Sequence, residues 1–380
     1  MGVSIGISIM YHPRRRDGVE QIQQACLPLI AVPVEDPDPA GIPSPIRAAK
    51  RAWATIASGV THHLVLQDDV VLAPDFASRL QTLVERFPDR PVALYIGDYS
   101  AFNSFQARMA ALAGQSWANL VPWEWVPTLG LVMPREIAAD LAAFLYGFDD
   151  HYIADDEAIR LFCAWRRLQL VAPIPHLLDH VTGGASLVGN AHHGPRKATV
   201  PFAERSNGGT KLPTPDTAAL TLNDDAMHAV CLYQSRCRVD LPLPGETVLT
   251  RPFRPNLDWP FWREQCGHLG VAADLLERSG TEYLASVAAC RDDAELSALA
   301  MEAWVAGNLL GLGLERRVWV RDNADDEAYA DRLGQLAIRS WIEAGFSVDD
   351  RRRIGVDGVA VLEAVCTAAI ARGRRLAESV

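Results

Sequence analysis

HHLVLQDDVVL, the stretch His62–Leu72, contains an apolar run that ends in two aspartates, Asp68 and Asp69. A continuous apolar run is typical of a parallel strand that is buried on both faces. In open α/β sheets, ligands bind outside the carboxyl ends of the strands, which is where these two carboxylates fall. Two adjacent carboxylates are costly to bury unless a positive charge neutralises them, and hard divalent cations prefer carboxylate oxygens. The stretch therefore predicts a strand that leads into a metal site at the edge of a sheet.

The residues around this stretch alternate between strand and helix patterns. Short β-branched and apolar runs bounded by Pro or Gly predict strands, and apolar residues spaced three or four apart predict helices. Alternating elements with short connections are typical of an α/β domain with a mostly parallel sheet. The expected strands are Val3–Met10, Ile30–Val34, His63–Leu66 and Val92–Ile96, and the expected helices are Gly18–Leu27, Ser44–Ser58 and Pro74–Phe87.

The length and the distribution of prolines predict two domains. A chain of 380 residues exceeds one ordinary domain. Residues 190–222 have the Gly, Pro, Ser and Asn content of a linker, and beyond Pro260 the chain has no proline and a helical periodicity. We therefore expect a Rossmann-type catalytic domain at 1–200, a linker at 201–222 and a mainly α-helical domain at 223–380. The role of the helical domain is not indicated, and it is the candidate surface for a homo-oligomer.

Composition argues against several classes of protein. The formal net charge is -11 at pH 7, whereas binding along a phosphate backbone needs clustered Lys and Arg, so we expect no nucleic-acid partner. No run of about 18 apolar residues occurs, so we expect no membrane span, and the N-terminal residues lack a signal-peptide pattern. The 7 cysteines are scattered without a Cys-x-x-Cys motif, which is typical of reduced thiols in a cytoplasmic protein.

A second acidic pair, Asp155 and Asp156, begins an expected helix. Acidic residues at an N-cap and in a first turn stabilise the helix dipole, and this alone would explain the pair. A carboxylate at a helix start can also face a cleft and act as a general base. The structural alternative applies to Asp68 and Asp69 as well, because the Asp-Asp dipeptide occurs seven times in the chain and most copies are expected to be caps or turns. The pair at 68 differs because an apolar strand precedes it.

A histidine, His180, precedes a Gly-rich segment at 182–189. Glycines allow the backbone to approach a phosphate closely. A lone histidine is more often structural than a metal ligand, so the importance of His180 depends on the motifs around it.

The order of these motifs resembles the GT-A fold glycosyltransferases, and within them the bacterial relatives of glycosyltransferase families 25 and 2. Leu66–Val70 is similar to their Asp-x-Asp motif, with Gln67 in place of the first acidic residue. The resemblance implies that Asp69 binds a divalent metal, Mn²⁺ or Mg²⁺, and that Asp68 supports the ribose or a metal-bound water. It also implies a further metal ligand at His180.

The resemblance extends to the rest of residues 3–195. Ile9, Tyr11 and Asp36 lie in segments similar to those that hold the nucleotide. Asp155 and Asp156 are similar to a Glu-Asp pair whose second carboxylate deprotonates the acceptor hydroxyl in inverting enzymes, so Asp156 is the expected base.

The function that this resemblance implies is transfer of a sugar from a nucleotide-sugar, in particular a UDP-sugar, to an acceptor hydroxyl with inversion. The acceptor could be a glycan, a natural product or a peptide. Trp123 and Trp125 are candidates to bind it because indole faces stack on sugars, although core packing is the more common fate of tryptophan. The Arg14–Arg16 cluster is a phosphate site or a solvated basic loop.

Two other functions remain open from the sequence. A nucleotidyltransferase of similar topology would also use paired aspartates and a metal, but it favours a Gly-rich basic loop after the first strand, and Tyr11–Arg14 contains no glycine. The other alternative is a non-catalytic scaffold, in which the α/β domain is inert and the helical domain binds partners.

Overall fold

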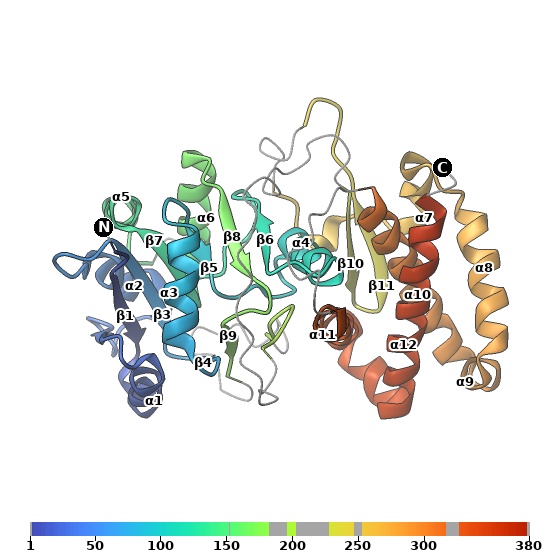
Figure 1. The fold of residues 1–380 in the computed structure, drawn as a ribbon, viewed down its shortest axis with the longest axis horizontal. Coiled ribbons are helices and arrows are strands. Elements are labelled where there is room, and N and C mark those ends of the chain that lie inside the picture. Colours follow the sequence, from blue (N-terminus) through green and yellow to red (C-terminus); the bar gives the residue numbers. More distant parts are fainter. Residues whose placement is uncertain are drawn as a thin grey trace. The chain divides into compact units, whose positions relative to one another are not determined.

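The computed structural model describes residues 2–151, 153–181, 196–202, 228–246, 253–316 and 327–377. The Gly-rich segment at 182–189 and the expected linker at 201–222, apart from Pro201 and Phe202, lie outside these residues. The chain divides into two compact units, whose elements are labelled in Figure 1. The first unit comprises Met1–Asn103 and Ser116–Thr214, and the second comprises Ser104–Gln115 and Pro215–Val380.

The first unit is built on a seven-stranded sheet with the order β2-β1-β3-β7-β5-β8-β6 (Figure 1). β1, β2 and β3 run parallel, as do β5 and β8, whereas β7 is antiparallel to β3 and β5 and β6 is antiparallel to β8. The predicted α/β class with a mostly parallel sheet is therefore confirmed. The strands are β1 (Ile5–Tyr11), β2 (Ala31–Glu35), β3 (His62–Gln67), β5 (Val92–Ala93), β6 (Trp117–Leu120), β7 (Gly130–Pro134) and β8 (Leu170–Pro173).

The helices of the first unit pack in two groups. One group pairs α1 (Arg16–Cys26) with α3 (Phe76–Arg86), and the other brings α2 (Pro45–Ala54) against α5 (Arg135–Leu145) and α6 (Asp155–Arg166). α2 begins as the sequence predicts, with Ser44 at the N-cap and Pro45 in the first turn. Each helix buries an apolar face, as the spacing of Val19 and Ile22 in α1 predicts.

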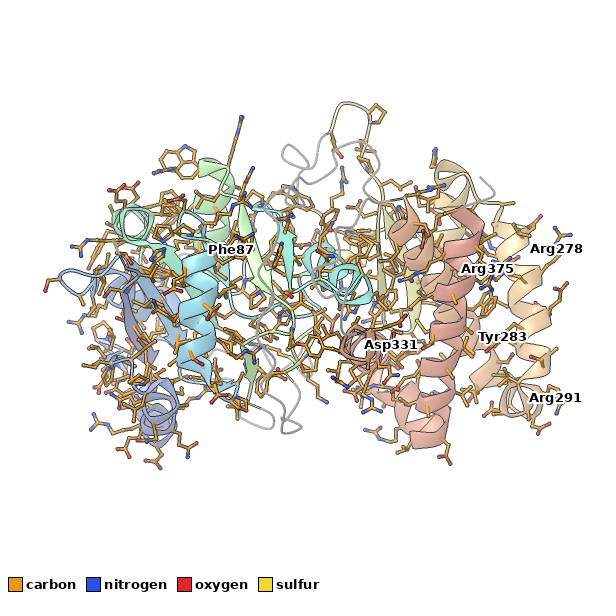
Figure 2. The ribbon with its side chains drawn as sticks, viewed as in Figure 1. Phe87, Arg278, Tyr283, Arg291, Asp331 and Arg375 are labelled. Carbon is orange, nitrogen blue, oxygen red and sulfur yellow. The ribbon has the colours of Figure 1, made fainter. Side chains whose placement is uncertain are left out.

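The core of this unit lies along the central strands. Every residue of β1 is buried, and so are His62–Leu66 of β3, which matches a strand covered on both faces. At one end of the sheet Phe87, labelled in Figure 2, packs edge-on against Trp117 of β6 with ring centroids 5.6 Å apart. Burial of such aromatic pairs is a major source of stability in a domain core.

One expected strand is shorter in the structure. Val92–Ile96 was expected from its apolar run, but β5 retains the ladder only at Val92–Ala93. Leu94 N still donates to Gly130 O at 2.9 Å, after which the chain leaves the sheet and Gly97 forms an isolated bridge with Ala198. Leu94–Ile96 are fully buried, and the carbonyls of Leu94 and Ile96 accept from Leu177 N and Thr199 N, so the apolar run continues in an irregular, buried extension of β5.

The second unit contains a mainly helical region and one hairpin. The hairpin pairs β10 (Ala229–Tyr233) with β11 (Arg236–Asp240). α10 and α12 approach so closely that a Cβ at Gly311 or Gly373 would overlap a carbonyl oxygen of the other helix. The helices are α7 (Trp262–Gln265), α8 (Ala273–Ser286), α9 (Ala288–Asp292), α10 (Ala294–Glu315), α11 (Glu327–Gly345) and α12 (Val348–Ala377).

A helix from the first half of the chain completes the second unit. α4 (Ala101–Leu112) belongs to it from Ser104 onwards. The buried Arg108 lies over the Trp341 ring at 5.3 Å from the centroid, and its Nε donates to Ala337 O at 3.3 Å. Arg374 Nη2 donates to Leu112 O at 3.0 Å. The second unit is therefore assembled from two separate segments of sequence, which the sequence did not indicate.

Two helices of the described residues are long and apolar enough to cross a membrane by length and composition. They are α10, with a mean hydropathy of 1.2 over its most apolar window, and α12, with 1.8. The α10 window is 72% buried inside the structure, as is usual for a core helix, whereas that of α12 is 33% buried. The expectations of no membrane span and of a cytoplasmic location stay predictions.

Candidate functional site

Asp68 is fixed at the carboxyl end of β3 by two donors from the segment that follows β1. His12 N donates to Asp68 Oδ2 at 2.8 Å, and Arg15 Nη1 donates to Asp68 Oδ1 at 2.8 Å. Burial raises the pKa of Asp68 more than these two donors lower it. Both oxygens of this carboxylate are engaged, so Asp68 is suited to orienting its neighbours.

Asp69 and His180 are brought together by a small second sheet. β4 (Val70–Leu72) follows Asp69 directly and pairs antiparallel with β9 (Leu178–His180), with Val70 opposite His180. Val181 N donates to Asp69 O at 2.9 Å, which fixes this register. As a result His180 Nε2 lies 3.3 Å from Asp69 Oδ2. The structure thus joins the two residues that the sequence predicted as metal ligands.

The Asp69 carboxylate lies beside a guanidinium and an imidazole. Burial raises the pKa of Asp69, but His180 and Arg15 more than offset this, so the net pKa is lowered. Burial lowers the pKa of His180, and Asp69 more than offsets this effect, so the net pKa is raised. At neutral pH the Asp69 carboxylate is therefore charged and available to a cation.

One buried atom of the pair, Asp69 Oδ1, has no hydrogen-bond partner among the described residues, while His180 Nε2 faces only the other oxygen of the same carboxylate. Unsatisfied buried polar atoms are rare and often mark a site for an ion or a ligand. One carboxylate oxygen and one imidazole nitrogen fit a divalent cation such as Mn²⁺. The described residues contain no group of three or more metal-ligating side chains, so a cation held here would take its other ligands from water or from a substrate.

The acidic helix start lies beside the same motif. α6 begins at Asp155, and the N-cap position belongs to Ala154, so Asp155 is not the N-cap that its sequence position suggests. Gln67 Nε2 donates to Asp155 Oδ2 at 3.2 Å and to Thr128 Oγ1 at 2.9 Å. This contact brings the start of α6 to the carboxyl end of β3, where Asp68 and Asp69 follow.

Asp155 and Asp156 differ in accessibility. Asp155 is buried, and burial together with the neighbouring Asp156 charge raises its pKa to about 7. Asp156 is half-buried, and burial raises its pKa while the Glu157 N–H and the Arg196 charge oppose the shift. Asp156 is therefore the less buried residue of the pair.

Sequence reasoning missed two residues of this site, Tyr99 and Arg196. Tyr99 is half-buried, and burial of its hydroxyl and the nearby Asp156 charge raise its pKa. The Arg196 charge acts on Asp156, on Tyr99 and on His180. One signal could have indicated Tyr99, since Gly97–Tyr99 follows an apolar run in the same way that Asp68 follows β3. No motif indicated Arg196.

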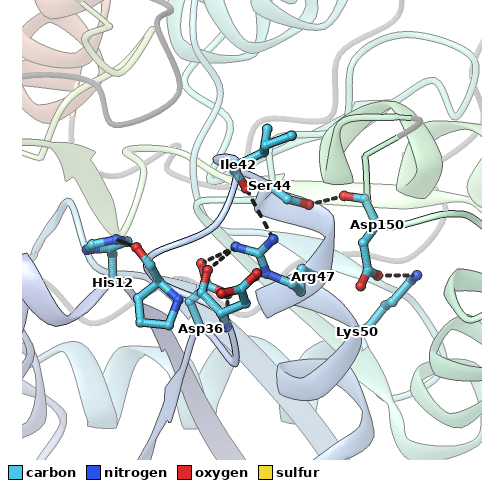
Figure 3. A network of polar contacts seen from close by, with 9 residues as sticks. His12, Asp36, Ile42, Ser44, Arg47, Lys50 and Asp150 are labelled. Atoms are coloured by element: carbon cyan, nitrogen blue, oxygen red, sulfur yellow. Dashed lines mark hydrogen bonds and ion pairs between the residues drawn. The ribbon is translucent and has the colours of Figure 1, made fainter.

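The expected nucleotide-binding residues have other partners. Ile9 is fully buried in β1. Tyr11 is also buried, and its hydroxyl donates to Glu35 Oε2 at 2.6 Å. Asp36 accepts from Arg47 Nε at 2.7 Å and from Arg47 Nη2 at 2.9 Å, and both side chains are buried (Figure 3). The structure brings none of these three into contact with Asp69.

The Asp36–Arg47 pair belongs to a network that supports the site from α2 (Figure 3). Arg47 also donates to the carbonyls of Asp38 and Ile42. From the next turn of α2, Lys50 Nζ donates to Asp150 Oδ1 at 2.7 Å. These contacts fix the loop after β2 and hold the segment that leads to the acidic start of α6.

The two tryptophans differ in their surroundings. Trp123 is buried and packs edge-on against Phe102, with ring centroids 4.9 Å apart. Trp125 is half-buried, and the Arg160 guanidinium lies 5.9 Å from its ring centroid. Arg160 is held by Glu157, three residues earlier on α6. Trp123 therefore belongs to the core, while Trp125 is partly exposed and lies close to α6.

In comparisons with known proteins, the chain matches no family model and no curated protein sequence. The functional argument therefore depends on the geometry of the residues described above.

Proposed function

We propose that the protein is a metal-dependent glycosyltransferase of the GT-A type, which moves a sugar from a UDP-sugar to an acceptor hydroxyl with inversion. The observation that carries the proposal is the contact of Gln67 with Asp155, which joins a two-residue cation site and a carboxylate pair at one edge of a mostly parallel sheet. Such an edge is the usual ligand site of an open α/β sheet.

Asp69 and His180 would hold the cation, Mn²⁺ or Mg²⁺. Bound there, the cation supplies Lewis-acid stabilisation of the charge on the departing nucleoside diphosphate. Asp68 supports this arrangement by fixing the segment after β1 through His12 N and Arg15. The second basic residue in reach of the site, Arg196, adds positive charge beside Asp156 and His180.

Asp156 is the proposed base. Its raised pKa keeps it a stronger proton acceptor than an ordinary aspartate, and its partial exposure lets an acceptor hydroxyl approach. Asp155 is buried and tied to Gln67, and burial together with the Asp156 charge raises the pKa of Asp155, so Asp155 is the member of the pair that holds a proton more readily. We assign proton removal to Asp156 and a positioning role to Asp155.

The acceptor is proposed to lie against Trp125. This ring is half-buried and close to the start of α6, so one face can stack on a sugar or another flat apolar group. Trp123 is withdrawn as an acceptor residue because its ring packs on Phe102 inside the core.

The first test is calorimetry of UDP with the full chain, with and without Mn²⁺. We expect binding that strengthens when Mn²⁺ is present, and a non-catalytic scaffold should show no such coupling. A panel of nucleotide-sugars scored for release of nucleoside diphosphate then identifies the donor. A nucleotidyltransferase would instead release pyrophosphate from a nucleoside triphosphate. Detection of pyrophosphate would therefore favour that function over a glycosyltransferase.

A further inference from the structure

Arg15 joins the two aspartates of the site through a single nitrogen. Its Nη1 donates to Asp68 Oδ1 at 2.8 Å and to Asp69 Oδ2 at 2.9 Å. Asp69 Oδ2 is also the oxygen that faces His180 Nε2 at 3.3 Å. A guanidinium therefore already neutralises the carboxylate that a cation held by Asp69 and His180 would use.

Arg15 and a bound cation would compete for the same negative charge. Two ionised carboxylates and one guanidinium leave one net negative charge, and a divalent cation would change this to one net positive charge. Like charges a few ångströms apart repel strongly where water is partly excluded, and the side chains of Asp68, Asp69 and Arg15 are 10%, 19% and 21% exposed. Close contact of Arg15 with a metal-bound Asp69 is therefore unfavourable.

We propose that Arg15 is an exchangeable counter-ion, which holds Asp68 and Asp69 before the metal binds and turns to the donor diphosphate afterwards. The inference rests on the proposed function and adds to it a residue that recognises the diphosphate. Guanidinium groups match phosphate oxygens in geometry as well as in charge. The released Arg15 thus becomes a ligand for the anion that the metal also binds.

The local backbone allows this exchange without refolding. Arg15 ends a short 3-10 turn, Pro13–Arg15, in which Arg15 N donates to His12 O at 2.8 Å. His12 N in turn donates to Asp68 Oδ2, so the turn stays attached to Asp68 when the guanidinium leaves. Only the side chain of Arg15 needs to move.

The test is calorimetry of Mn²⁺ alone, and of UDP at saturating Mn²⁺, on the full chain and on Arg15→Gln. Glutamine removes the charge but keeps an N–H donor for the carboxylates. We expect Mn²⁺ to bind about tenfold more tightly and UDP about tenfold more weakly, the scale of one charge-assisted hydrogen bond. Opposite shifts in the two affinities are the signature of the exchange, because general damage to the site would weaken both.

Arg14→Gln is the matched control. Arg14 is the exposed neighbour in the same turn and carries the same charge, so its loss tests the effect of net charge alone. We expect neither affinity to change by more than about twofold. Arg15→Lys keeps the charge without the planar fork, so Mn²⁺ affinity should stay near the original value while UDP affinity falls. Arg15→Lys also serves if circular dichroism shows that Arg15→Gln does not fold.

Failure of this inference is distinct from failure of the proposed function. If Arg15→Gln binds Mn²⁺ no more tightly than the unmodified chain, the exchange is wrong, even when Mn²⁺-coupled UDP binding of the unmodified chain persists. If the unmodified chain binds neither Mn²⁺ nor UDP, the glycosyltransferase proposal fails and the inference fails with it.

Discussion

Gln67 Nε2 donates to Asp155 Oδ2 at 3.2 Å, across 88 residues of sequence. In the proposed likeness to an Asp-x-Asp motif, Gln67 stands in place of the first acidic residue. An amide donor here satisfies an oxygen of the buried Asp155, whereas a carboxylate would place a third negative charge next to the acidic pairs. The contact with Asp155 therefore explains why an amide, and not a carboxylate, stands at position 67.

Gln67→Glu should accordingly destabilise the protein most at high pH. At pH 8 both the introduced carboxylate and Asp155 would be ionised, whereas at pH 5 a protonated Asp155 can donate to the introduced carboxylate. We expect a loss of about 1–3 kcal/mol at pH 8, the cost of an unsatisfied buried polar group, and a smaller loss at pH 5. Calorimetric unfolding at both pH values measures it, and equal losses would show that Gln67 does not face an ionisable partner.

Asp69→Asn and Asp68→Asn should separate the two roles at the end of β3. Asp69→Asn removes the charged ligand that is paired with His180, so Mn²⁺-dependent UDP binding should be lost by about a hundredfold or more, comparable to loss of two strong charged contacts. Asp68→Asn keeps an acceptor for His12 N, so its effect should be closer to about tenfold. Calorimetry in Mn²⁺ compares them, and the reverse order would exchange the two assignments.

Asp156→Asn should give a rate defect without a binding defect. Asparagine keeps the size of the side chain but cannot accept the acceptor proton, so turnover should fall by about a hundredfold or more. UDP affinity and the melting temperature should stay near those of the unmodified chain. Near-normal turnover, measured on the same sample as the melting temperature, would refute the base assignment and favour a retaining mechanism.

Asp155 should make stability depend on pH. Burial raises its pKa to about 7 from an ordinary value of 3.8, so between these values the folded state binds more protons than the unfolded state. Its contribution to stability is therefore complete at low pH and is lost as pH rises toward 7. Asp155→Asn does not titrate, so its stability relative to the unmodified chain should improve from pH 4 to pH 7.5.

The improvement should exceed about 1.4 kcal/mol, the equivalent of one pKa unit. Scanning calorimetry across this range measures it. Asp274→Asn, at an exposed position in the first turn of α8, is the control. Its stability relative to the unmodified chain should not rise in the same way from pH 4 to pH 7.5. If the stability of Asp155→Asn relative to the unmodified chain also stays constant with pH, the pKa of the Asp155 carboxyl is not raised.

The sheet could be predicted because the apolar composition of its central strands indicates that they are buried. His62–Leu66 is apolar enough to require cover on both faces, and the observed β3 differs from the expectation by one residue at each end. The same reasoning fails for Leu94–Ile96, where an apolar run is buried without continuing the ladder. The composition of a segment predicts whether it is buried, but it does not predict which of its backbone groups form the hydrogen bonds of a sheet.

The candidate site was predicted in its acidic residues and not in its basic ones. Adjacent aspartates after a strand are visible in sequence, but the contact of Asp69 with His180 depends on the three-residue strands β4 and β9, which are too short to show a period. The Arg14–Arg16 cluster was visible too, but only the turn at Pro13 determines that Arg15 is the member that faces the carboxylates. The pairing of Asp36 with Arg47 crosses a loop and has no sequence signal.

The position of Ser104–Gln115 has a consequence for the way the protein is made. Domains usually fold as units while the ribosome still extends the chain. This segment emerges before its contacts Ala337, Trp341 and Arg374, and the hydrogen bonds to Ala337 and from Arg374 span 229 and 262 residues of sequence. Its fully buried Phe105 packs against His228, with ring centroids 5.8 Å apart, and its buried Arg108 lies over Trp341, so the segment stays uncovered while only the first unit has been made. A nascent chain that stops before α11 should be a substrate for chaperones that bind apolar segments.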